Sequence, residues 1–146
     1  HSTFAPPPTC YEAGTPFIEG AVALHQALKF IDNYDVNSMR QHMSLLAQTA
    51  YERFNEIENL RILFLHNQQR APIYSMTLSN IHAHDLSTFL DTQGICARAG
   101  HHCTMPLIRQ LSLPATLRFS FHLYNTVDEV NTCADILIKA REFFHD

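Results

Sequence analysis

The length, composition and charge of the sequence describe one folded domain. A chain of 146 residues, with 46% apolar and 16% charged residues, favours a packed core over disorder. The net charge of -4 without a basic run excludes a surface built for nucleic acid. No apolar run approaches the roughly 18 residues that span a bilayer. We therefore expect neither nucleic acid nor a membrane among the partners.

The beginning of the chain predicts an extended lead-in. Three consecutive prolines at residues 6–8 are incompatible with a helix, and the first ten residues lack the basic and apolar regions of a secretory signal. The four cysteines form no CxxC pair, and nothing else in the sequence is typical of a secreted protein. These features favour a reducing compartment, and we expect a cytoplasmic protein.

Apolar periodicity then predicts alternating helices and strands. Helices are expected over residues 19–34 and 37–57, the second capped by Asp35 or Asn37. Further along, strands are expected at 61–66, 71–79, 95–99 and 115–121, and helices at 82–94, 106–111 and 125–144. Thr126 and Glu129 have the spacing of a capping box. The predicted class is α+β, a small, largely antiparallel sheet with helices packed on one face.

One segment carries most of the polar chemistry. ARAGHHCTMPLIRQLSLPATLRFSF, residues 97–121, places Arg98, His101 and His102 close to Cys103, with Arg118 further along. Positive charge stabilises a thiolate, which is the nucleophilic form of cysteine. The pattern indicates a reactive Cys103 on a loop, and a buried structural cysteine is the alternative.

The other cysteines lack this setting. Cys96 and Cys133 have apolar neighbours and are expected in the core. Cys10 lies in the proline segment, where no neighbouring residue is a candidate for catalysis. A cysteine hydrolase would need an orienting third group and an oxyanion hole, and the sequence marks neither.

Arg118 stands inside an otherwise apolar predicted strand. A buried guanidinium without a partner is costly, and a carboxylate matches its planar fork with two parallel hydrogen bonds. The partner is either the carboxylate of a substrate or a structural Asp or Glu.

The segment IHAHDL suggests a metal site at first sight. His82, His84 and Asp85 are close in sequence, but no further ligands have the spacing of a zinc site. We expect no metal here, and expect His84 or Asp85 to serve the N-terminus of a helix.

These residues resemble a known family. RAGHHCTMPL (98–107), followed by PATLRFSFHLYNT (114–126), is similar to the C-terminal region of group II (SufS/CsdA-like) cysteine desulfurases. Those enzymes are class V aminotransferase-like and use pyridoxal phosphate. YEAGTP (11–16), IHAHDLSTFLDTQGICARAG (81–100) and the closing DEV helix also occur in order. The resemblance covers nearly the whole chain.

The resemblance implies roles by position. Cys103 corresponds to the cysteine that attacks the substrate sulfur and holds it as a persulfide. Arg118 corresponds to the arginine that binds the carboxylate of L-cysteine, and Arg98 to one that supports the substrate pocket. His101 and His102 correspond to positions beside the nucleophile, and the family makes neither a sure general base.

Two further positions are marked by the resemblance. Gly14 and Thr15 correspond to a loop that, in the family's homodimer, reaches the cofactor phosphate of the partner subunit. Phe119 departs from the family, because relatives commonly have a small residue after the arginine, and its bulk is expected to narrow the substrate site.

The implied reaction converts L-cysteine to L-alanine and leaves a persulfide on the enzyme. Its sulfur would pass to a SufE-like acceptor protein for iron–sulfur cluster assembly. The two lysines, Lys29 and Lys139, lie outside the histidine-lysine context of a Schiff-base lysine. We therefore expect a fragment, inactive and without cofactor by itself. It would consist of a lead-in at residues 1–18 and a small C-terminal domain at 19–146, without the large cofactor-binding domain.

Two other functions stay open at this point. One is a stand-alone module that accepts sulfur or docks a sulfur carrier. The other is a domain of a related class V aminotransferase or lyase, although a transaminase would not need Cys103.

Overall fold

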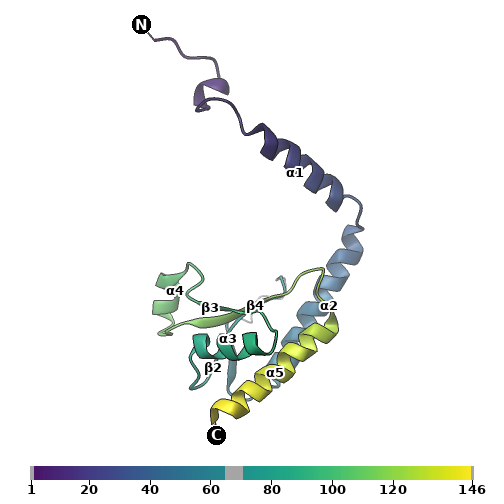
Figure 1. Cartoon of the computed structure of the whole chain (residues 1–146), viewed down its shortest axis with the longest axis vertical. Coiled ribbons are helices and arrows are strands. Elements are labelled where there is room, and N and C mark those ends of the chain that lie inside the picture. The colour runs from purple at the N-terminus through teal and green to yellow at the C-terminus, as the bar shows by residue number, and fades with distance from the viewer. Residues whose placement is uncertain (1, 65–70, 146) are drawn as a thin grey trace. The chain divides into compact units, whose positions relative to one another are not determined.

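The computed structural model describes residues 2–64 and 71–145 (Figure 1). The chain divides into two compact units, His1–Ser38 and Met39–Asp146, which are described separately. None of the helices in the described ranges is both long and apolar enough to cross a membrane. The domain limits predicted at residues 18 and 19 stay a prediction.

The first unit contains a short 3-10 helix, η1 (Thr9–Tyr11), and α1 (Ile18–Ile31). The predicted helix over residues 19–34 is therefore confirmed. None of the described residues of this unit is buried within it. Several apolar side chains of α1, including Val22 and Leu28, are more than half exposed.

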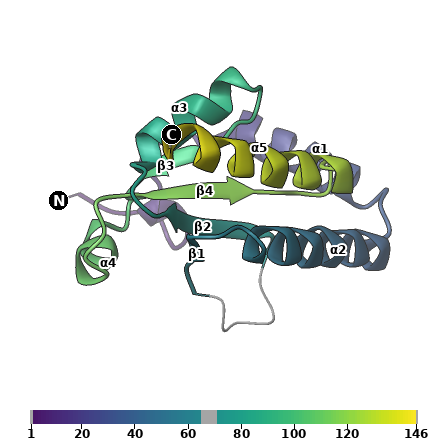
Figure 2. The same ribbon diagram turned by 90° about the horizontal axis from the view of Figure 1, so that it is seen from below.

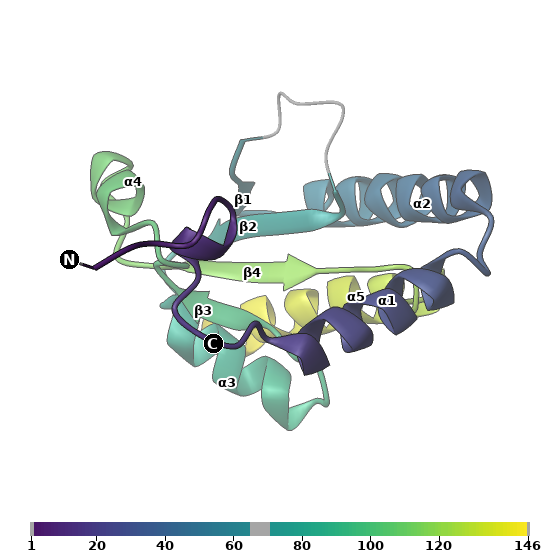
Figure 3. The same cartoon turned by 90° about the horizontal axis from the view of Figure 1, so that it is seen from above.

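The second unit is built on four short antiparallel strands. They are β1 (Leu60–Ile62), β2 (Ile73–Leu78), β3 (Arg98–Gly100) and β4 (Thr116–Ser120). Their order across the sheet is β1-β2-β4-β3 (Figure 3). The prediction of a strand over 61–66 is confirmed for its first residues, and residues 65 and 66 lie outside the described ranges.

Four helices complete the described elements. α2 (Val36–Asn55) begins after Asp35, whose carboxylate accepts hydrogen bonds from the backbone N–H and the hydroxyl of Ser38, 2.8 and 2.6 Å. Of the two predicted caps, Asp35 is confirmed and Asn37 is not. The others are α3 (Ala83–Thr92), α4 (Met105–Gln110) and α5 (Val127–His145).

The predicted capping box at the start of α5 is confirmed. The Thr126 hydroxyl accepts from the Glu129 N–H at 3.1 Å, and the Glu129 carboxylate accepts from the Thr126 N–H at 2.9 Å. The hydrogen bonds that the Glu129 carboxylate accepts from the Thr126 N–H and from the Asn125 side chain lower the pKa of Glu129 below its usual value. This cap fixes where the chain turns from β4 into α5.

The core lies on one face of the sheet. Alternate residues of β2 and β4 point into it, and it also takes apolar residues of α2, α3 and α5: Tyr74, Met76, Leu78, Leu117, Phe119, Leu46, Ala50, Phe54, Leu86, Leu90, Val130, Ala134 and Leu137. Figure 2 shows α3 and α5 together on one side of β4. The predicted fold, an antiparallel sheet with helices on one face, is confirmed.

Phe54 is the centre of an aromatic cluster in this core. Its ring is 5.5 Å from that of Tyr74, 5.6 Å from that of Phe119 and 6.3 Å from that of Phe121. The cluster joins α2 to β2 and β4. It anchors the two central strands and leaves their other face free for polar side chains.

Candidate functional site

The sheet face opposite the core carries a row of polar side chains. Arg118 of β4 pairs with Ser75 of β2 on one side and with Arg98 of β3 on the other. Paired residues of adjacent strands point to the same face of a sheet. Arg98, Arg118 and Ser75 therefore lie side by side on this face, which we call the open face.

Arg118 is not paired with a structural Asp or Glu in the described residues, which was one of the two partners considered from the sequence. It is only partly exposed, and its buried Nε has no hydrogen-bond partner. Within residues 2–64 and 71–145, Arg118 forms no ion pair with a carboxylate. A buried donor without a partner is unusual in proteins. This arrangement suits an anionic ligand better than an internal ion pair.

Cys103 lies in the loop between β3 and α4, which follows the strand that carries Arg98. The thiol is exposed, so the alternative of a buried structural cysteine is wrong. His102 and Cys103 have φ of 53° and 62°, in the left-handed region that residues with a Cβ seldom adopt. Such conformations persist where neighbouring groups hold them, and they are frequent at functional sites.

Both histidines of this loop are hydrogen-bonded to main-chain carbonyls just before β4 or at its first residue. Nε2 of His101 is 3.0 Å from the carbonyl oxygen of Pro114, and Nε2 of His102 is 3.1 Å from that of Thr116. Nδ1 of His102 is buried and has no partner among the described residues.

The surroundings of His102 favour its neutral form. Burial is the largest cause that lowers its pKa, and the charges of Arg118, Arg98 and His101 act in the same direction. The hydrogen bond to the Thr116 carbonyl opposes them. At neutral pH this imidazole therefore presents an unprotonated nitrogen near two guanidinium groups.

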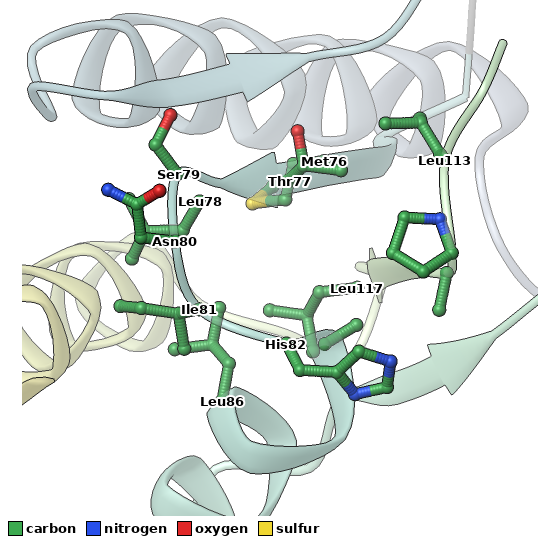
Figure 4. A pocket seen from close by; sticks show the side chains of 13 residues that line it. Met76, Thr77, Leu78, Ser79, Asn80, Ile81, His82, Leu86, Leu113 and Leu117 are labelled. Carbon is green, nitrogen blue, oxygen red and sulfur yellow. The ribbon is translucent and has the colours of Figure 1, made fainter.

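A separate hollow of about 400 Å³ lies at the end of β2 and the start of α3 (Figure 4). Its walls are mainly apolar side chains, including Met76, Leu86, Leu113 and Leu117, and His82 is at its edge. No predicted site residue lines it. Because it holds neither a thiol nor a guanidinium, the open face is the better candidate site.

His82, and not His84 or Asp85, caps α3, and Asp85 serves this end of the helix only through its charge. Nδ1 of His82 accepts a hydrogen bond from the backbone N–H of His84 at 3.3 Å, and the two rings stack. Asp85 lies in the first turn, where a negative charge is favourable, but it does not form the cap. Among the residues that the structure describes, no group of three or more His, Cys, Asp or Glu side chains could hold a metal ion.

Two other expectations were wrong. Cys96 was expected in the core but is exposed, because Ile95 and Ala97 take the inward positions of this extended segment. Phe119 was expected to narrow the substrate site, but it is buried in the core on the other side of the strand from Arg118. Cys133 is buried as expected, and burial is the main cause that raises its pKa to about 11.

The two residues expected to meet a cofactor, Gly14 and Thr15, both lie in the first unit, and each unit contains one of the two lysines. Gly14 and Thr15 are exposed in His1–Ser38, and Gly14 has φ of 120°, which suits glycine. Lys29 is exposed on α1, and Lys139 is exposed on α5, which covers the sheet face opposite Arg118. Lys139 therefore does not fit the covalent attachment of pyridoxal phosphate beside Arg118, and we derive no step through that cofactor.

Sequence reasoning missed Ser75 and the two acceptor carbonyls. Alternation in residues 71–79 places Ser75 opposite the buried Tyr74, but only strand pairing brings it beside Arg118. The carbonyls of Pro114 and Thr116 carry no side-chain signal.

The sheet and its helices form the fold of a known family. The family model of aminotransferase class V matches residues 1–133. The chain therefore belongs to the aminotransferase class-V family.

The curated relatives are much longer than this chain. A probable cysteine desulfurase of Staphylococcus epidermidis is 41% identical over 143 residues, which are 98% of this chain and 35% of that protein. One of Halalkalibacterium halodurans is 38% identical over the same shares. The chain thus spans about a third of the length of the relatives it matches.

Solved structures have the same fold. The apo structure of a cysteine desulfurase from Thermococcus onnurineus aligns with a TM-score of 0.86 at 30% identity, over 96% of this chain and 35% of that one. The cysteine desulfurase CsdA of Escherichia coli, in an S-sulfonic acid form, aligns with a TM-score of 0.80 at 31% identity. That alignment covers 90% of this chain and 32% of CsdA.

Proposed function

We propose that this chain is the small domain, with its lead-in, of a pyridoxal-phosphate-dependent cysteine desulfurase. Support comes from the family, from relatives named cysteine desulfurases, and from their length. The proposed limits are residues 1–18 for the lead-in and 19–146 for the domain. The cofactor would be held mainly by residues outside this chain, with Gly14 and Thr15 reaching its phosphate in the partner subunit of a homodimer.

One observation carries the proposal for the open face. Arg118 has a buried Nε without a partner, and Arg98 lies directly beside it. The carboxylate of L-cysteine matches this need, since a guanidinium binds a carboxylate through charge-assisted hydrogen bonds. We assign carboxylate binding to Arg118 and support of the pocket to Arg98.

Cys103 is the proposed sulfur acceptor. Its sulfur forms a new S–S bond with the substrate sulfur while the carbon–sulfur bond of the substrate breaks. L-cysteine and the Cys103 thiol thus become L-alanine and a Cys103 persulfide. The sulfur is oxidised and the β-carbon is reduced, so no external oxidant is required.

The exposure of Cys103 suits the next step as well. Thiol–disulfide exchange requires access of an attacking thiol to the sulfur. A SufE-like acceptor protein could therefore reach the persulfide on this loop, in the cytoplasm, for iron–sulfur cluster assembly. The neighbouring His101 and His102 are not assigned as bases.

The experiment uses the complete gene product with L-cysteine and measures alanine formation. We expect Cys103→Ala to lose nearly all alanine formation and Cys96→Ala, at a cysteine that is also exposed, to keep it. Equal activity of wild type and Cys103→Ala would reject the proposal, as would absence of alanine formation by the wild type.

A further inference from the structure

The loop that carries Cys103 has a backbone that costs free energy. His102 and Cys103 are both left-handed, and Gly100 just before them has φ of 136°. Each left-handed residue with a Cβ costs roughly 1 kcal/mol or more. Contacts outside the loop must therefore hold it in this form.

Two imidazoles supply such contacts. His101 and His102 reach the carbonyls of Pro114 and Thr116, at 3.0 and 3.1 Å. A carbonyl oxygen only accepts hydrogen bonds, so each ring must carry its proton on Nε2. Both carbonyls precede Arg118 by a few residues on the same extended segment.

The charge of the His102 ring depends on whether its other nitrogen, Nδ1, carries a proton. Nδ1 is buried without a partner, so a proton there would lack an acceptor. The charged or titratable groups near it are Arg118 of β4, Arg98 of β3 and His101 of the same loop, and positive charge on any of them opposes protonation of His102. The neutral Nε2–H tautomer is thus the form that the surroundings favour.

We propose that His101 and His102 are positioning residues that hold the Cys103 loop at a fixed place relative to Arg118. Each does so by donating its Nε2–H to a main-chain carbonyl, that of Pro114 just before β4 or that of Thr116 at its first residue. We call these two hydrogen bonds the brace, and they are present whatever the function of the chain. The importance of the brace for sulfur transfer rests on the proposed function.

Substitution by glutamine separates the hydrogen bond from the imidazole. The side-chain amide of glutamine carries an N–H donor at a reach similar to Nε2, whereas alanine has no donor. Asparagine is unsuitable because it favours the left-handed conformation by itself. His25, exposed on α1 and without a hydrogen bond among the described residues, is the matched control.

Hydrogen exchange of the Thr104 amide reports the closed loop, because this N–H donates to the His101 carbonyl at 2.9 Å. In this chain we expect His101→Ala and His102→Ala to speed its exchange roughly two- to tenfold, as for the loss of one hydrogen bond. The glutamine variants and His25→Ala should stay close to wild type. Unchanged exchange of the Thr104 amide in both alanine variants would show that the two histidine hydrogen bonds do not hold the loop.

Nitrogen NMR gives an independent reading. At about pH 8, well above the ordinary histidine pKa, both rings should carry their proton on Nε2. The Nδ1–H tautomer at either histidine would refute the assignment.

Kinetics of the complete gene product test the positioning role. His102→Ala should lower kcat at least several-fold with KM for L-cysteine nearly unchanged, and His102→Gln should restore most of the loss. An unchanged kcat, or an increase in KM without a decrease in kcat, would overturn the positioning role. If the wild type does not turn over L-cysteine, the proposed function fails. The hydrogen exchange of Thr104 and the tautomers of the two histidines still test whether the two hydrogen bonds hold the loop.

Discussion

Arg98 and Arg118 lie directly opposite each other on β3 and β4, in an antiparallel pair that points both side chains to the open face. Like charges in such positions destabilise a sheet. In the described part of the chain, neither arginine has a carboxylate partner that would offset the repulsion. The pair is thus a local cost in stability, and an anionic ligand would relieve it.

Removal of one charge should therefore stabilise the free chain. We expect Arg98→Thr to raise the free energy of unfolding by roughly 0.2–1 kcal/mol, measured by urea denaturation. Arg61→Thr is the matched control, because Arg61 is also exposed on an edge strand but faces Thr77 instead of an arginine. A gain that is no larger in Arg98→Thr than in the control would contradict the repulsion.

Arg118→Lys keeps the charge but loses the planar fork. A charge-assisted hydrogen bond contributes roughly 1.5–3 kcal/mol, so kcat/KM of the complete enzyme for L-cysteine should fall about ten- to a hundredfold. Arg109→Lys, at an exposed arginine of α4, should have little effect. If Arg118→Lys folded normally and kept its kcat/KM, the carboxylate role would be wrong.

Cys96, Cys103 and Cys133 should react at different rates. Cys133 should resist alkylation in the native chain near neutral pH, because it is buried with its pKa raised to about 11, and should react after denaturation. Cys96 and Cys103 are both exposed, so Cys96 is the control for a thiol that is accessible but lies between two apolar residues. We expect Cys103 to react faster, as mass spectrometry after limiting alkylation can determine, and faster labelling of Cys96 would count against activation.

The lowered pKa of His102 predicts a pH-dependent stability. Above the ordinary value of 6.5, the imidazole is neutral in the folded and unfolded chains and its contribution is fully present. As the pH falls from 6.5 through the lower folded pKa, the unfolded chain binds the proton first, and this stability is lost.

His102→Gln cannot take up that proton. The difference in unfolding free energy between about pH 8 and about pH 5.5 should therefore be smaller in this variant than in wild type. The same difference in both proteins would show that His102 does not titrate in this way.

Local signals predicted much of the fold. Alternation placed Tyr74, Met76 and Leu78 on one face, and the Thr126–Glu129 spacing predicted a cap that the structure contains. These features depend on neighbours in sequence. Apolar context predicted the burial of Cys133 for the same reason.

Features that depend on strand pairing could not be predicted. Cys96 lies outside because Ile95 and Ala97 pack inward, and an apolar neighbourhood does not reveal which residue of an extended segment points out. Phe119 faces the core because adjacent residues of a strand point to opposite faces, so bulk beside Arg118 in sequence is not bulk beside it in space. The row of Ser75, Arg118 and Arg98 exists only through the sheet register.

The most direct test of the central claim is to locate the transferred sulfur. The complete enzyme is incubated with L-cysteine without reductant, its thiols and persulfides are alkylated, and the peptides are examined by mass spectrometry. We predict one additional sulfur on the peptide containing Cys103, absent in Cys103→Ala and present in Cys96→Ala. An additional sulfur on Cys96, or on no cysteine of this chain while alanine is formed, would contradict the assignment of Cys103 as the sulfur acceptor.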